Sequence, residues 1–124
     1  MYILRGNENL KKTEIIKKNY EFKYFFKKGK AFSGELINVF VFNSYLDVNR
    51  LGIAVSKRIG GSVVRNRVKR FIREAYTDIE ERITVNCNML IVWKKTAKAD
   101  LANFYDIRED LINLLIKSGN LKGN

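Results

Sequence analysis

The 124-residue sequence contains no histidine, no proline and only one cysteine. Histidine is the side chain most often used to transfer protons near neutral pH, so its absence excludes the histidine pair that pancreatic-type ribonucleases use. It also excludes every zinc site that includes histidine, and one cysteine cannot form a zinc site by itself. Cys87 cannot form an internal disulfide, which is compatible with a reducing compartment. Its position at the edge of an apolar run favours an inert, partly buried thiol over a reactive one.

Long apolar segments are also missing. The longest near-uniform run extends from Leu36 to Phe42, is interrupted by Asn38, and is far too short to span a bilayer. The first ten residues lack the apolar centre and the small-residue cleavage site of a secretory signal. We therefore expect a cytoplasmic protein that has no membrane partner.

Positive charge is abundant. Lysine and arginine total 24 against 13 acidic residues, which gives a formal net charge of +11. Such an excess favours a polyanionic partner. The length and the 46% of hydrophobic residues suit one folded domain. We expect a single domain over residues 1–124, with 1–12 and 120–124 loosely ordered.

The order of predicted elements indicates an α+β fold. Asn19 is a plausible N-cap for a first helix that Gly29 would end, Ser62 for a central helix, and Gly119 would end the last helix. The pattern α-β-β-β-α-β-α, with a short first strand, predicts an α/β sandwich of one sheet with helices. The expected helices span 19–28, 62–81 and about 100 or 103–117, and the clearest strands span 36–42, 51–55 and 89–93.

Alternation along the strand at 36–42 predicts two different faces. Ile37, Val39 and Val41 suit a core, whereas Asn38, Phe40 and Phe42 could form a surface lining. In the next strand, one face carries only small residues, which leaves room either for a groove beside Phe40 or for a packed helix. These small residues are Gly52, Ala54 and Ser56.

The predicted helix at 62–81 is strongly amphipathic. At about 100° per residue its apolar side chains share about 100° of arc, and its cations fill the other side. The apolar set is Val64, Val68, Phe71, Ile72, Ala75 and Ile79. From Lys57 to Arg73 there are seven cations and no acid. Charge alone leaves three interpretations open: nucleic acid, a solvated basic face, or another anionic partner.

The segment from Ser56 to Glu74 reads SKRIGGSVVRNRVKRFIRE. It closely resembles the signature of the bacterial ribonuclease P protein family, in which a Ser-Lys-basic stretch and a glycine turn precede a helix bearing Arg-Asn-Arg, a Lys-Arg pair and a further Arg. The segment from Asn19 to Gly29, with its aromatic residues before a basic residue and glycine, is similar to the family's first helix. The weaker resemblance covers most of the chain beyond about Leu10.

The resemblance implies an accessory subunit of an endoribonuclease that removes the 5′ leader of precursor tRNA. It implies that a large RNA subunit carries catalysis and holds most of the Mg²⁺ ions, so no catalytic and no metal-binding residue is assigned to this chain. It implies a fold like that of ribosomal protein S5 domain 2, with a left-handed crossover between the strands at 51–55 and 89–93. We expect the protein to be monomeric within the holoenzyme. The RNA-subunit contacts would be Lys57, Arg58, Arg65, Asn66, Arg67, Lys69, Arg70 and Arg73, and the leader contacts Phe22, Phe26, Phe40 and Phe42.

For the phenylalanines the residues leave two interpretations open. Aromatic side chains beside cations offer stacking surfaces for a single strand. A Phe22–Phe26 stripe on a helix is also an ordinary core stripe, and Phe25 is assigned to the core.

Three other functions compete. A protein-only nuclease would need converging carboxylates, whereas the acids after the basic face and in the last helix look like solvated charges. These acids are Glu74, Asp78, Glu80, Glu81, Asp106, Glu109 and Asp110. A ribosomal or other structural RNA-binding protein is the principal alternative. DNA binding through a helix-turn-helix is disfavoured, because a predicted strand precedes Gly60 where a helix is required.

Overall fold

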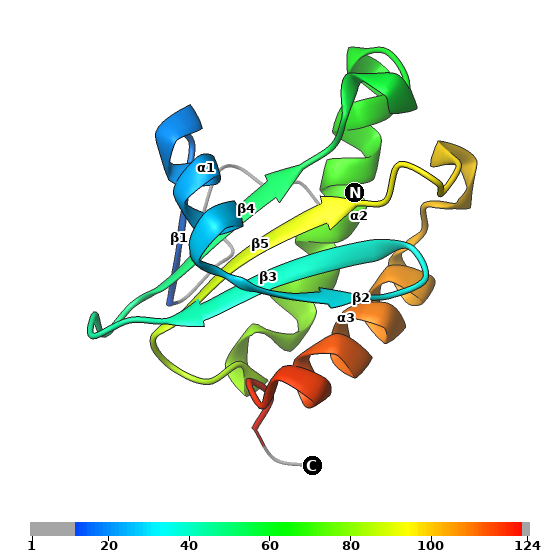
Figure 1. Ribbon diagram of the computed structural model, residues 1–124. Coiled ribbons are helices and arrows are strands. Elements are labelled where there is room, and N and C mark those ends of the chain that lie inside the picture. The colour runs from blue at the N-terminus through cyan, green and yellow to red at the C-terminus, as the bar shows by residue number, and fades with distance from the viewer. Residues whose placement is uncertain (1–11, 123–124) are drawn as a thin grey trace.

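One five-stranded mixed sheet separates a layer with one helix from a layer with two (Figure 1). The computed structural model describes residues 12–122. The strand order is β1-β4-β5-β3-β2, with β1, β4 and β5 parallel and β3 antiparallel to β5 and β2. The elements are β1 (Thr13–Ile15), α1 (Asn19–Lys28), β2 (Lys30–Ser33), β3 (Ile37–Asn43), β4 (Asn49–Ala54), the 3-10 turn η1 (Lys57–Ile59), α2 (Ser62–Ile79), η2 (Glu80–Arg82), β5 (Cys87–Trp93), η3 (Ala99–Leu101) and α3 (Phe104–Ser118).

The main core lies between the sheet and helices α2 and α3. Ile37, Val39 and Val41 of β3 are all buried in it, as the alternation predicted. The buried stripe of α2 is also confirmed, except that Val64 and Phe71 are only half-buried and that the buried Tyr76 joins it. The buried side chains of α3 are Ile107, Asp110, Leu111, Leu114 and Leu115.

A smaller apolar cluster lies on the opposite face, under α1. Phe25 is 1% exposed and packs there with Ile16 and Leu90, so its assignment to the core is confirmed. Partly buried side chains around this cluster include Phe22, Phe40, Phe42, Ala54 and Val92. The other side of the sheet is therefore covered only in part, by one ten-residue helix.

Two helix starts differ from the prediction. Asn19 and Ser62 are the first helical residues rather than the caps, and the cap positions belong to Lys18 and Gly61. At α1 the carboxylate of Glu21 takes over the capping role, because it accepts the backbone N–H of Lys18 at 3.3 Å.

The two predicted terminating glycines act in different ways. Gly119 ends α3 in the left-handed region, at φ 79°, where glycine carries no steric penalty. Gly29 has an ordinary extended backbone, but a Cβ there would lie 2.8 Å from the carbonyl oxygen of Phe25 and 2.9 Å from Phe40. Glycine at 29 thus permits close contact between α1 and the sheet.

The N-terminal strand β1 was not predicted. It pairs with β4 and is joined to the end of α2 by polar contacts: Thr13 Oγ1 donates to Glu80 Oε2 at 2.6 Å, and the Lys12 N–H donates to the same oxygen at 3.0 Å. Glu80 is 3% exposed, so its assignment as a solvated charge is wrong. The predicted loose ordering of residues 1–11 lies outside the described residues.

Two further expectations near the C-terminus are wrong. Asp110 is 8% exposed rather than solvated, because its carboxylate accepts the backbone N–H groups of Glu35, Leu36 and Ile37 at 2.9–3.1 Å. Asn120 is buried and donates to Thr84 Oγ1 at 3.0 Å, and the next residue bridges to the chain before β5, so the ordered part extends past 119. Residues 123–124 lie outside the described residues.

The parallel pairing of β4 and β5 through α2 agrees with the implied crossover. Its left hand and the detailed likeness to the second domain of ribosomal protein S5 stay predictions.

Candidate RNA interface

The basic segment, from Lys57 to Arg73, forms one continuous structural unit. It consists of η1, a glycine turn and the first twelve residues of α2. The Ser56 hydroxyl accepts the backbone N–H of Arg58 at 3.2 Å, which fixes the start of η1. A Cβ at Gly60 would lie 3.0 Å from the Val64 side chain, whereas one at Gly61 would meet nothing within 4 Å. The turn therefore packs tightly against the first turn of α2.

All eight predicted RNA-subunit contacts lie on this segment and reach its surface. Five side chains are exposed and three are half-buried, in contrast to the buried apolar stripe of the same helix. The exposed ones are Lys57, Arg58, Asn66, Arg67 and Arg70, and the half-buried ones are Arg65, Lys69 and Arg73.

Two of the arginines are held by backbone carbonyls. Arg65 Nε donates to the Gly60 carbonyl at 3.2 Å, and an Arg67 Nη donates to the Ala99 carbonyl at 3.3 Å. Each bond restricts the side chain and leaves other guanidinium N–H groups for an outside acceptor. A restricted guanidinium loses less conformational entropy when it binds a phosphate.

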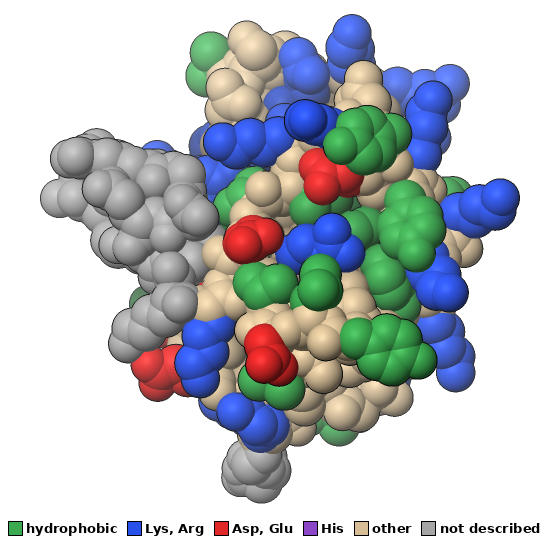
Figure 2. All heavy atoms as spheres, turned by 90° about the vertical axis from the view of Figure 1, so that its left-hand side faces the viewer, with side chains coloured by type: hydrophobic (Ala, Val, Ile, Leu, Met, Phe, Trp, Pro, Cys, Tyr) green, Lys and Arg blue, Asp and Glu red, His purple; other side chains and the backbone are tan. Residues whose placement is uncertain are grey.

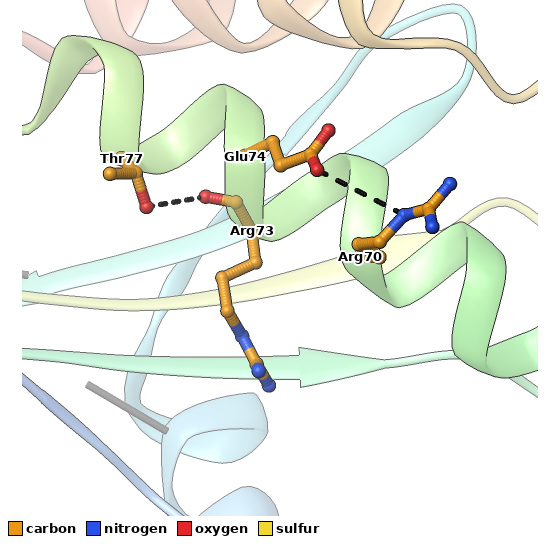
Figure 3. A network of polar contacts seen from close by, with 4 residues as sticks. All are labelled: Arg70, Arg73, Glu74 and Thr77. Carbon is orange, nitrogen blue, oxygen red and sulfur yellow. Dashed lines mark hydrogen bonds and ion pairs between the residues drawn. The ribbon is translucent and has the colours of Figure 1, made fainter. Parts of the chain in front are cut away.

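Arg70 and Arg73 have different surroundings although both lie on α2 (Figure 3). Arg70 Nε is 3.9 Å from Glu74 Oε2, a long i,i+4 pair between an exposed arginine and a half-buried glutamate, and at this distance it is of little strength. Arg73 extends away from both, and its Nε is buried with no hydrogen-bond partner. Burial lowers the pKa of Arg73 from its usual value, since the charged form loses hydration. An anion at Arg73 would offset that loss.

The predicted leader contacts lie across the sheet and fall into three environments. Phe26 is 60% exposed, and its ring lies over Phe40 with centroids 4.7 Å apart and planes at 36°. Phe22 is half-buried, and a Cβ at Gly52 would lie 3.1 Å from its ring. Phe42 is packed edge-to-face by Phe25, at 5.1 Å. The Phe26–Phe40 pair is therefore the part of this set most open to a ligand.

The room above Gly52 is filled. A Cβ there would also lie 2.7 Å from Ile16 Cδ1, and the nearby Phe22 belongs to α1, so at this position the packed-helix alternative is correct. Beyond Phe40, the strand register aligns Asn38, Val92 and Ala54 in one row across three strands. Asn38 Oδ1 in that row is buried without a hydrogen-bond partner, and β4 leads from the row into η1.

Within residues 12–122, no three cysteine, aspartate or glutamate side chains are grouped so that they could hold a metal ion. The Cys87 thiol is fully buried, and burial raises its pKa to about 12, which agrees with the prediction of an inert thiol. None of the described helices has the length and hydropathy needed to cross a bilayer.

Similarity to known proteins agrees with this geometry. The family model described as Ribonuclease P matches residues 10–119. The chain belongs to the ribonuclease P protein family. The ribonuclease P protein component of Clostridium botulinum (strain Langeland) is 36% identical over 109 residues, which cover 87% of this chain and 96% of that protein. The component of Clostridium novyi is 38% identical over 112 residues, 89% and 97% of the two chains.

Solved structures of ribonuclease P proteins have the same fold. The protein from Staphylococcus aureus superposes with a TM-score of 0.74 at 29% identity, over 87% of this chain and 97% of its own. The protein from Thermotoga maritima also gives 0.74, at 28% identity and over 84% and 96%. The chain is thus a protein component of ribonuclease P, a subunit of an endoribonuclease that acts in tRNA processing, and the structural RNA-binding alternative is not favoured.

Arg50 is a surface residue that the sequence did not single out. Its Nε donates to Asn88 Oδ1 at 3.0 Å, and its guanidinium carbon lies 5.2 Å from the centre of the Phe25 ring. Arg50 is the one charged residue of β4, between Asn49 and Leu51, so no local pattern marks it. Only the packing of α1 on the sheet reveals its position.

Proposed function

We propose that two separate surfaces of this chain bind different RNAs in the holoenzyme. The basic segment binds the ribonuclease P RNA, and the Phe26–Phe40 pair binds the single-stranded 5′ leader of precursor tRNA. The observation that carries this proposal is that the two surfaces are connected. The row of Asn38, Val92 and Ala54 crosses the sheet from β3, which carries Phe40, to the end of β4, which leads into η1.

Binding to the RNA subunit is supported by charge and geometry. Four arginines and one asparagine lie on consecutive turns of α2, and two of the arginines are restrained by Gly60 and Ala99. The planar guanidinium donates two parallel hydrogen bonds to a phosphate, and an asparagine amide can address a 2′-hydroxyl. A folded RNA presents both groups along its surface.

Leader binding is supported by the exposure of Phe26 and by its contact with Phe40. Base stacking on aromatic side chains tolerates any sequence, which suits leaders that differ between precursors. Phe22 packs on the same small cluster as Phe40, so we assign it a supporting part. Phe42 lies under Tyr24 and Phe25, so we assign it a supporting part rather than a contact.

We assign the hydrolytic step and its Mg²⁺ ions to the RNA subunit. The acids that follow the basic segment have other partners: Asp78 pairs with Arg108, and the Glu74 carboxylate faces Arg70. Phosphodiester hydrolysis with magnesium needs carboxylate or phosphate oxygens that converge on the ion. RNA phosphates can supply them. We further propose a cytoplasmic holoenzyme with one copy of this chain.

Reconstitution tests the proposed function. Cleavage of precursor tRNA at near-physiological magnesium is compared for this chain alone, a bacterial ribonuclease P RNA alone, and both together. We expect efficient cleavage at the mature 5′ end only when both are present. Cleavage by the chain alone would reveal a protein active site, and no effect of the folded chain on the RNA would favour a structural RNA-binding role.

A further inference from the structure

Helix α1 has a second surface besides the one that carries Phe26. With Phe25 pointing at the sheet, Phe22 and Phe26 lie on one side of α1 at about 100° per residue. On the other side, Tyr20 and Tyr24 share an arc of about 100° with Lys27 and Lys28. The two sides are separated by the width of the helix.

The two tyrosines are exposed but ordered by their neighbours. Tyr20 is 66% exposed, and Lys18 Nζ lies 5.8 Å from the centre of its ring. Tyr24 is 52% exposed, and its ring meets Phe42 edge-to-face at 5.7 Å and 86°. Along the helix axis they are about 6 Å apart, a separation that adjacent nucleotides of an unstacked strand can span. Two restricted aromatic rings are therefore open to solvent side by side.

Arg50 adds a fixed cation near this side. Its Nε is bonded to Asn88 and its guanidinium lies over Phe25, the residue next to Tyr24. The terminal Nη groups of Arg50 make no hydrogen bond to any of residues 12–122. The arrangement holds the guanidinium in place while leaving its terminal N–H groups for an acceptor from outside.

Cations lie on both sides of the tyrosines along the chain, Lys17 and Lys18 before them and Lys27 and Lys28 after them. Figure 2 looks onto this end of the molecule and shows exposed hydrophobic side chains with lysine and arginine around them and several acidic side chains among them. The sole acid of α1 is Glu21, and its carboxylate accepts the backbone N–H groups of Lys17 and Lys18. Lysine is depleted in the centres of protein–protein interfaces, whereas aromatic rings among cations are typical of single-strand binding.

We propose that Tyr20, Tyr24, Lys27, Lys28 and Arg50 form a second binding surface for single-stranded RNA. We call it the tyrosine surface. It lies across α1 from the Phe26–Phe40 pair, and the proposal does not depend on which RNA occupies that pair. Two bases stack on the tyrosine rings, and Arg50 with the lysines neutralises the backbone beside them.

The test measures binding of labelled RNA to the full chain without any ribonuclease P RNA. The probes are a twelve-nucleotide oligouridine and an RNA duplex of the same length. The test variant is Tyr20→Ala/Tyr24→Ala. The matched control is Tyr105→Ala, which removes a tyrosine that is 78% exposed on α3, on the opposite face of the sheet. Thermal unfolding of each variant verifies the fold.

We expect the double variant to bind the single strand about tenfold or more weakly, because it loses both rings on which bases stack. Duplex binding and the control variant stay within twofold of the original chain. A single-strand affinity within twofold of the original would overturn the proposal. So would an equal loss for strand and duplex, because it would indicate a change of fold or charge rather than stacking.

A second variant covers the case in which loss of the Tyr24–Phe42 contact unfolds the chain. Lys27→Gln/Lys28→Gln keeps every aromatic contact, and it should flatten the salt dependence of single-strand binding by about 0.7 for each lost phosphate contact. An unchanged slope would contradict the proposal. If the original chain sediments as a dimer and the tyrosine variant as a monomer with unaltered RNA binding, the surface binds protein and the proposal fails.

Discussion

Substitution of Phe26 by alanine should weaken binding of precursor tRNA while destabilising the fold less than truncation of the buried Phe25 does. The Phe26 ring is 60% exposed, so roughly two fifths of its surface is removed from water. A fully buried aromatic side chain covers about 150–250 Å², so Phe26 buries about 60–100 Å², worth about 1.5–2.5 kcal/mol at 25 cal/mol per Å². Truncation of Phe25, which is 1% exposed, should instead lower the free energy of unfolding by about 3–5 kcal/mol.

The expected loss in binding follows from stacking. A base that stacks on Phe26 contributes about 1–3 kcal/mol, so Phe26→Ala should weaken binding of precursor tRNA by roughly 5- to 150-fold. Mature tRNA has no leader, so its affinity should stay the same. The conservative variant Phe26→Leu keeps an apolar contact with Phe40 but removes the aromatic face, and it should show most of the same loss with a smaller change in stability.

The assay measures the dissociation constants of the reconstituted holoenzyme for precursor and mature tRNA, and urea unfolding of the free protein. Phe25→Ala is the reference for a core residue. The reasoning is refuted if Phe26→Ala leaves the ratio of the two dissociation constants unchanged. It is also refuted if Phe26→Ala lowers the unfolding free energy as much as Phe25→Ala does.

Three further predictions test other parts of the structure. Arg65→Ala and Arg67→Ala should each weaken binding to the RNA subunit and lower the slope of log K against log salt by about 0.7–0.9, whereas Arg108→Ala on α3 should leave both unchanged in filter-binding titrations. Asp110→Ala leaves three backbone N–H groups without their acceptor, one of them buried, and should lower the unfolding free energy in urea by about 3 kcal/mol. Native Cys87 should resist thiol reagents at pH 8. Folding raises the pKa of the Cys87 thiol from 9.0 to about 12, so the folded state favours the protonated thiol. The stabilisation from burying this thiol is therefore complete below pH 9 and declines between pH 9 and 12. A fast-reacting thiol in the folded chain would contradict this.

Local patterns in the sequence determined the parts of this protein that depend on near neighbours. The buried stripe of α2, the cationic segment beside it and the alternation of β3 all follow from spacing within one element. The basic segment could be assigned because seven cations without an acid lie on one turn and one helix. Charge alone left three interpretations of this segment open, and the resemblance of Ser56–Glu74 to the ribonuclease P protein signature favoured RNA binding.

Contacts between distant parts of the chain decided the rest. Glu80 and Asp110 look like ordinary helix acids, and only β1 and the turn before β3, which lie 67 to 75 residues away, make them buried acceptors. Phe22 and Phe26 are one turn apart on α1 and indistinguishable by pattern. Their burial differs in the folded chain, because Phe22 packs near Gly52 and Ile16, whereas Phe26 rests on Phe40 and stays exposed. Burial is a property of the whole packed chain, so periodicity assigns a side chain to a face and only the tertiary structure determines whether that face is covered.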